Sequence, residues 1–464
     1  MGFFGQLLNL VASPLGLVGL IAIPFILSKA KRSPKLVWFL VAACCFTASL
    51  AEFRDEFTLE APALVFPLQQ LRSSGRPLTI LLLGILLWLG IGLPKQPSWR
   101  RHLMPAPIGC IAAIQLLLFL KTLGSGSITL AFLAIITFTG VVLMIRLGPS
   151  RWLQNDATFD LAIWSIAVVG IIFILTNSYQ ALFDPYPITF VQDAFLGTTG
   201  NPQHAATLLA TTVPCLLFLI EKHTAWKTKS IWIMALIAVF YALFLTASRT
   251  GALMGIVSVI LFYRQRQRAL LHLGLCMAVI LPIAIMMFGD TSFSVGTGAI
   301  DDQLFNIDNT RAGVWAAQLR GFNQYPIFGV PLRGDRFIPG ENSWLAVAAS
   351  LGSVGLIPLI LFSLSCFQMI YQLTKMGKKY PTYVFHCNTI VAGLLSLIVG
   401  SIFEGFLLGT LTFPLIALFI YLSLGQYLID LYHATRDLSS QYLIQNSNPY
   451  AKMFTGEQKL EVYD

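Results

Sequence analysis

The sequence predicts an all-α protein that crosses a membrane many times, and three observations support this fold class. Hydrophobic residues make up 56% of the 464 residues and charged residues only 11%, less than half of the roughly 25% usual in soluble domains. The apolar residues form continuous runs of roughly 17–22 residues, the length of a helix that spans the bilayer core. They do not alternate every second residue, as the strands of a membrane barrel would.

We expect about 12–13 spanning helices and one long external loop, 289–343, that contains short helices. A loop longer than about 15 residues between packed elements is usually functional or disordered. The chain then divides into N-terminal transmembrane helices (1–176), a second transmembrane region (177–428) and a tail (429–464). The expected spans are 7–28, 36–51, 77–93, 105–120, 127–145, 158–176, 204–220, 231–248, 250–263, 269–288, 344–371, 384–402 and 407–428.

Basic residues in alternate connecting segments predict the orientation. Clusters such as Lys222, Lys227 and Lys229 follow every second span. Because Lys and Arg concentrate on the cytoplasmic side of membrane proteins, these segments and the tail are predicted to be cytoplasmic, and the N-terminus and loop 289–343 external. Topology accounts for the positive charge, so we expect membrane lipids and no nucleic acid as partners. The sequence has no P-loop, dinucleotide fingerprint, CxxC or HExxH, so neither a cofactor nor a metal is expected.

Arg249 is the most informative single residue. It lies at the outer end of an expected span, where basic residues are scarce, so it should bind an anion or reach toward external headgroups. Arg311 and Trp315 are four residues apart on a short helix expected from Arg311 to Arg320, and therefore share one face. Arg320 is interpreted either as a solvated, steering charge or as a substrate contact.

Four further polar residues are candidates. Glu341 and Asn342 precede the span 344–371 on the external side. Glu404 lies between two apolar runs and is either a short-loop charge or a pocket carboxylate. Asn201 precedes another span, where it either caps the helix or contacts substrate.

Four groups of residues form a recognisable pattern along the second half of the chain. They are Gly200-Asn201-Pro202-Gln203, Leu245-Thr246-Ala247-Ser248-Arg249-Thr250-Gly251, Arg311-Ala312-Gly313-Val314-Trp315 with Tyr325-Pro326-Ile327-Phe328-Gly329, and Glu341-Asn342-Ser343-Trp344-Leu345 with Leu351-Gly352-Ser353-Val354-Gly355-Leu356. These stretches resemble the O-antigen ligase and O-antigen polymerase superfamily, and the resemblance covers roughly residues 195–425. The first half of the chain matches only in general topology.

The resemblance implies a glycosyl transfer enzyme of the bacterial inner membrane that works on the periplasmic face. Members of the family move a sugar chain from an undecaprenyl diphosphate carrier to lipid A core, to another carrier-linked glycan or to a protein, without nucleotide or a required metal. The family's arginines fall on Arg249 and Arg311. Its ligases have a histidine where this chain has Glu341, which favours a polymerase of O-antigen or exopolysaccharide.

The chemistry that the resemblance implies suits these residue types. Arginines stay charged and hold phosphate bidentately, so Arg249 and Arg311 would stabilise the leaving diphosphate, and Glu341 would accept the proton of the acceptor hydroxyl. Asn201, Trp315, Asn342, Arg320 and Glu404 are predicted to bind substrate, and contact with other polysaccharide-assembly proteins is an open expectation. Alternatives are an O-antigen ligase onto lipid A core, a protein O-glycosyltransferase, and a transporter of a bicarbonate-like solute or a lipid.

Overall fold

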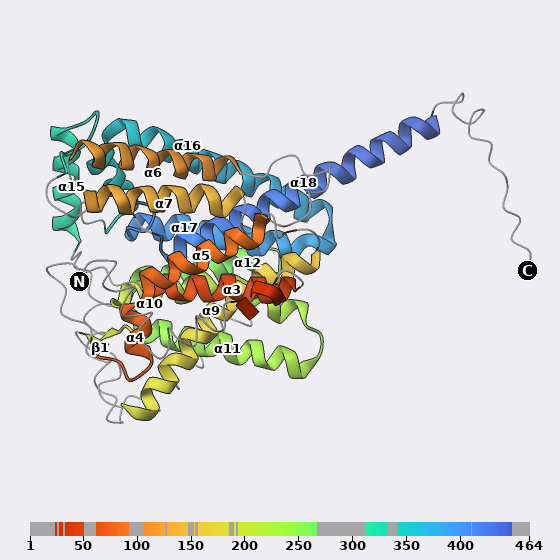
Figure 1. Ribbon diagram of the computed structural model, residues 1–464. Coiled ribbons are helices and arrows are strands. Elements are labelled where there is room, and N and C mark those ends of the chain that lie inside the picture. The colour runs from red at the N-terminus through yellow and green to blue at the C-terminus, as the bar shows by residue number, and fades with distance from the viewer. Residues whose placement is uncertain are drawn as a thin grey trace, which may run out of the picture.

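The computed structural model describes residues 24–25, 27–30, 33–50, 62–91, 105–125, 128–146, 153, 156–184, 190–191, 194–266, 311–332, 341–409 and 411–447. In these residues the fold is a bundle of helices with one short antiparallel hairpin, β1 (Phe190–Val191) with β2 (Ala194–Phe195) (Figure 1). The helices are α3 (Pro34–Ser49), α4 (Leu68–Ser73), α5 (Gly75–Ile91), α6 (Ala106–Gly124), α7 (Ile128–Arg146), α9 (Asp156–Phe183), α10 (Pro202–Lys222), α11 (Trp226–Leu245), α12 (Arg249–Phe262), α15 (Ala312–Gln324), α16 (Ser343–Lys379), the 3-10 turn η1 (Pro381–Tyr383), α17 (Val384–Phe403) and α18 (Phe413–Ser447).

The predicted fold class, an all-α polytopic membrane protein, is confirmed. Among the described residues, seven helices are long and apolar enough to cross a membrane, and four further apolar helices are shorter. The shorter ones include α12, which coincides within a residue with the short run expected at 250–263. The expected span 269–288 and most of the span 7–28 lie outside the described residues.

One continuous hydrophobic core contains residues from α3 through α18. Helix α10 is its most enclosed part: its side chains are buried from Ala205 to Ile220, since α9, α11, α12 and α17 pack around it. Small residues allow this close packing. A Cβ added at Gly251 of α12 would lie 2.6 Å from the Cβ of Ala206 on α10. The core therefore holds the beginnings of α10 and α12 side by side.

Basic residues of several helices lie at one end of the bundle. At one end, Lys222 pairs with Asp160, Arg266 pairs with Glu221 over 3.0 Å, and the Lys379 ammonium lies 5.6 Å from the Tyr432 ring. We call this the basic end. We call the other end the site end. Helices α10, α12, α15 and α16 begin there, and α17 ends there. Figure 1 shows α15 and β1 at the end of the bundle away from the far part of α18.

Several element boundaries differ from the sequence prediction. Helix α16 extends from Ser343 to Lys379 rather than from 344 to 371, and it is broken at Gly352. Helix α18 continues past residue 428 to Ser447. Helix α15 does not end at Arg320 but continues through Gly321 to Gln324. A Cβ at Gly321 would lie 2.8 Å from a methyl group of Val330, so this glycine allows close packing and does not terminate the helix.

Candidate functional site

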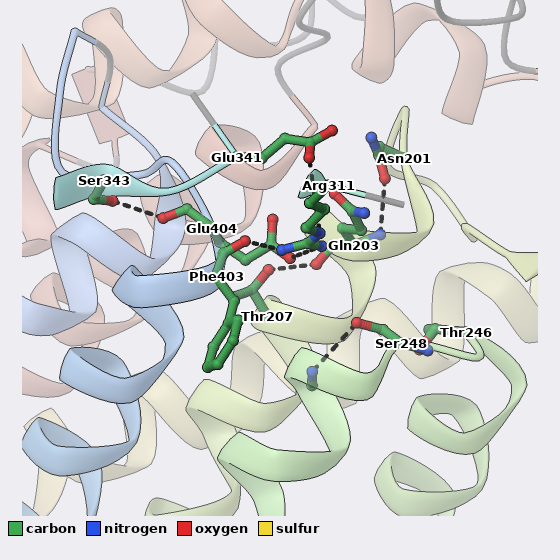
Figure 2. A network of polar contacts seen from close by, with 11 residues as sticks. Asn201, Gln203, Thr207, Thr246, Ser248, Arg311, Glu341, Ser343, Phe403 and Glu404 are labelled. Carbon is green, nitrogen blue, oxygen red and sulfur yellow. Dashed lines mark hydrogen bonds and ion pairs between the residues drawn. The ribbon is translucent and has the colours of Figure 1, made fainter. Parts of the chain in front are cut away.

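Helices α10, α12, α15 and α16 begin close to one another at the site end (Figure 2). The Asn201 side chain caps α10 by accepting from the Gln203 amide at 2.8 Å, and the Ser248 hydroxyl caps α12 by accepting from the Gly251 amide at 3.2 Å. Asn342 caps α16, and Arg311 is the N-cap residue of α15. Because a helix N-terminus carries partial positive charge, such a convergence favours an anion.

Arg311 lies at the centre of a polar network (Figure 2). Its Nη2 donates to Oε1 of Glu404 at 2.7 Å, and its Nη1 donates to the carbonyl oxygen of Phe403. Its Nε lies 3.9 Å from Oε2 of Glu341. Only 14% of the Arg311 side chain is exposed. Two carboxylates and the end of α17 therefore hold the guanidinium in place.

Glu404 connects the helices of the site. Its carboxylate binds Arg311 of α15 and also accepts a hydrogen bond from the Thr250 hydroxyl of α12. Its backbone oxygen accepts from the Ser343 hydroxyl of α16 at 2.6 Å. Burial raises the pKa of Glu404 to about 7; the Glu341 charge also raises it, while Arg311 and Thr250 act in the opposite direction. Glu404 therefore changes charge near neutral pH.

The turn before α12 places Thr250, the residue after Arg249, in this network. Ala247 has a φ of 51° and is 2% exposed, although a residue with a Cβ rarely adopts this left-handed conformation. The turn reverses the chain between α11 and α12. Arg249 follows as the exposed first residue of α12, and its neighbour Thr250 bonds Glu404. The two predicted catalytic arginines are thus linked through Thr250 and Glu404.

The other predicted site residues differ in their positions. Glu341 is 37% exposed and reaches both Arg311 and solvent. Asn342 is buried and accepts from the amides of Trp344 and Leu345, so it has the geometry of a helix cap. The Trp315 ring lies 6.2 Å from the Phe403 ring, on the Arg311 face of α15 as predicted. Arg320 is exposed, and its position nine residues after Arg311 places it on the opposite face of α15.

Sequence reasoning missed Thr250, Ser343 and the Phe403 carbonyl. The Ser343 hydroxyl donates to the Glu404 backbone oxygen and accepts from the Phe406 amide at 3.1 Å, so it fixes the segment after α17. The sequence did offer a signal for two of them, since Ser343 follows the cap residue Asn342 and Thr250 follows Arg249. In the described part of the chain, no group of three or more His, Cys, Asp or Glu side chains could hold a metal ion.

The comparison with protein families finds one match. Residues 233–360 match the family described as O-antigen ligase. No curated protein matches the chain. The matched segment extends from α11 into α16 and includes Arg249, Arg311 and Glu341, whereas Asn201 and Glu404 lie outside it. The resemblance to the O-antigen ligase and O-antigen polymerase superfamily, predicted from the sequence, is thereby confirmed for the segment 233–360.

Proposed function

We propose that this protein transfers a glycan from an undecaprenyl diphosphate carrier to a glycan acceptor at the periplasmic face of a bacterial inner membrane. The family match supports glycan transfer of the ligase or polymerase type in general. The observation that carries the finer proposal is the convergence of four helix N-termini, Arg311 and the Arg249-Thr250 turn around one buried carboxylate. A diphosphate is the anion that such a site suits.

The reaction that we propose is a direct displacement. The acceptor hydroxyl oxygen forms a bond to the anomeric carbon of the donor sugar. The bond between that carbon and the diphosphate oxygen breaks, and its electron pair leaves with the carrier. Arg249, Arg311 and the helix N-termini stabilise the negative charge that develops on the leaving oxygen. Glu341 accepts the acceptor's proton, since it is the more exposed of the two carboxylates beside Arg311.

The remaining candidates would bind the two substrates. Trp315 offers an aromatic face to a sugar ring, and Asn201 and Asn342 hold the helix N-termini that face the diphosphate. Arg320 would steer the anionic donor from the outer side of α15. Glu341 at the position where ligases have histidine favours a polymerase of O-antigen or exopolysaccharide. Polymerisation would then be the activity of this chain, with ligation to lipid A core or protein as the alternative outcomes.

Deletion of the gene, followed by gel analysis of surface polysaccharide, tests the proposal. A polymerase predicts single repeat units on the cell surface after deletion, restored to long chains by the wild-type gene and by Lys227→Ala. Lys227 is an exposed residue at the basic end and serves as the control. Long chains that stay on the carrier would show a ligase instead. Unchanged glycans, with solute uptake by the purified protein in liposomes that contain no donor, would contradict the proposal in favour of a transporter.

A further inference from the structure

The break in α16 is filled by another segment of the chain. Gly352 has φ 63° and ψ −154°, a conformation that is essentially restricted to glycine. A Cβ there would collide with the carbonyl of Ile327, and a Cβ at Gly329, which has φ 72°, would collide with the backbone of Ser350. The turn Tyr325–Gly329 after α15 therefore lies in backbone contact with the broken helix.

Hydrogen bonds tie the turn to both sides of the break. The amide of Val330 donates to the Ala349 carbonyl at 2.8 Å. On the other side, the Ser353 amide and hydroxyl both donate to the Pro326 carbonyl at 2.7 Å. A helix break leaves backbone donors and acceptors without their usual partners, and unsatisfied groups of this kind are costly near lipid. The turn supplies those partners.

Lys121, near the end of α6, also contacts the turn and the broken helix. We call the place where these three segments meet the joint. Its ammonium donates to the Phe328 carbonyl at 2.8 Å and also to the Ser350 carbonyl. The carbonyls at the end of the first half of α16, residues 343–351, carry partial negative charge, which a cation stabilises. A lysine at the site end of a membrane helix is unusual by the rule that places basic residues in the cytoplasm, and these contacts give it a structural role.

Chain length places the joint at the membrane boundary. A spanning helix needs about 20 residues. Counting back roughly that many from Lys375, which lies in the last part of α16 at the basic end, reaches about residue 355, just after the break. Lys121 likewise lies near the end of α6, a candidate span of 19 residues. The joint thus lies where the hydrocarbon core meets the headgroups.

The side chains of the turn extend an apolar surface of α6. Ile327 is 59% exposed and Phe328 is 71% exposed. Leu120 and Leu123, the neighbours of Lys121 on α6, are 54% and 56% exposed. Exposed leucines on a membrane-spanning helix face acyl chains, and the bond from Lys121 to the Phe328 carbonyl brings the turn against that part of α6. The lipid-facing surface of α6 is therefore continuous with the turn.

We propose that the turn Tyr325–Gly329 is a membrane anchor whose Ile327 and Phe328 side chains insert among the lipids of the leaflet at the site end. Helix α15 and the first half of α16 both begin at the candidate site and both end at this joint. The anchor thereby sets the depth of Arg311 and Glu341 relative to the bilayer. This inference requires that the chain spans a membrane, and it does not depend on the proposed reaction.

Spin labels in lipid nanodiscs test the anchor. A label at Phe328→Cys is compared with labels at Leu123→Cys, which faces lipid, and Lys227→Cys, which faces water; the unsubstituted protein gives the background from native cysteines. We expect the Phe328 label to resemble the Leu123 label, with accessibility to oxygen several-fold greater than to a water-soluble nickel chelate. Accessibility to nickel that equals or exceeds accessibility to oxygen, as at Lys227, would overturn the proposal and indicate a surface for water or a soluble partner.

A second measurement tests the role of Lys121 in the joint. Lys121→Met removes both hydrogen bonds and should make the Phe328 label more mobile, with its depth less well defined, whereas Lys121→Arg should restore the parent spectrum because it can donate to the same two carbonyls. An unchanged spectrum in Lys121→Met would remove Lys121 from the proposal. Neither readout requires a glycan donor, so failure here is distinguishable from failure of the proposed reaction.

Discussion

Glu404 controls the charge balance of the candidate site. When it is ionised, Glu341 and Glu404 balance Arg249 and Arg311, and the four side chains sum to zero (2 − 2). When it is protonated, they sum to +1 (2 − 1). A diphosphate is therefore bound more strongly by the protonated form. Because the pKa of Glu404 is about 7, this change falls within the physiological range.

The first prediction follows from this balance. As pH rises from 6 to 8, the KM for the lipid-linked donor should increase about tenfold. This corresponds to a loss of about 1.4 kcal/mol in the free energy of donor binding, which the added negative charge on Glu404 can account for. Glu404→Gln should keep KM at its low-pH value throughout. Burial raises the pKa in the folded state above the ordinary 4.5, so the associated stability is present below 4.5 and lost as pH rises through 7. A Glu404→Gln enzyme with the wild-type pH profile would contradict this role.

The second prediction concerns the arginines. Arg249→Ala and Arg311→Ala should each lower glycan transfer by about 100–1,000-fold, as expected when a donor to a developing oxyanion is removed. Transfer rates measured in membrane vesicles check this, with insertion confirmed by immunoblot and Lys227→Ala as the control. Arg311→Ala also leaves Glu404 without its cation, so Arg311→Ala combined with Glu404→Gln separates misfolding from lost catalysis. Polymer of normal length in both single variants would exclude the proposed anion site.

The third prediction concerns the base. Glu341→Gln should slow transfer about 100-fold because a neutral amide does not accept the acceptor's proton. Donor binding should be retained, since Arg249 and Arg311 remain and one negative charge is removed. Titration of the purified protein with the carrier-linked donor measures the binding, and a single-turnover assay measures the chemical step. Full transfer activity would assign the proton to another group.

At the scale of elements, Gly352 decides whether α16 can bend around the turn that follows α15. Gly352→Ala should lower the free energy of unfolding by about 1–3 kcal/mol, the usual cost of forcing a residue with a Cβ into such a conformation. Thermal unfolding in detergent checks this. Gly84→Ala on α5 is the matched control, because a Cβ there meets nothing within 4 Å. Equal melting temperatures for the two variants would mean that the break is not held by Gly352.

The elements also show what the sequence can and cannot predict. Most spanning helices follow from the length and apolarity of their runs, which is why α12 and α17 were expected within a few residues. The break in α16 was not expected, because its partner, the Ile327 carbonyl, comes from a segment that folds back onto the helix. Contacts over long sequence separation leave no local periodicity.

The candidate site shows the same division. Arg311, Glu341 and Glu404 were chosen individually, Arg311 from the family resemblance, Glu341 as an external carboxylate and Glu404 as a charge between two apolar runs, and the structure brings these three together. Thr250 and Ser343 were not chosen, since hydroxyls are common in membrane helices and their roles depend on one carboxylate and one carbonyl from residue 404. Asn342 was expected to meet substrate, yet its side-chain oxygen accepts from two backbone amides.

At the scale of the molecule, the basic residues at one end of the bundle predict its orientation. Lys222, Lys227 and Lys379 lie at the basic end, and the anion-favouring helix N-termini lie at the site end. The positive-inside rule then predicts that the basic end faces the cytoplasm and the candidate site the periplasm. This orientation matters for mechanism, because the proposed donor is already activated by its diphosphate and needs no nucleotide on the outer side.

The last prediction tests that orientation directly. In cells with a permeabilised outer membrane, a membrane-impermeant maleimide should label Arg320→Cys on α15 and should leave Lys227→Cys on α11 unlabelled until the inner membrane is disrupted. Both native side chains are exposed, so each substitution reports access. The described native cysteines are buried, apart from the half-buried Cys110, and the parent protein measures their background together with that of Cys276, which lies outside the described residues. The reverse labelling pattern would place Arg311 and Glu404 on the cytoplasmic face, where a periplasmic glycan could not reach them.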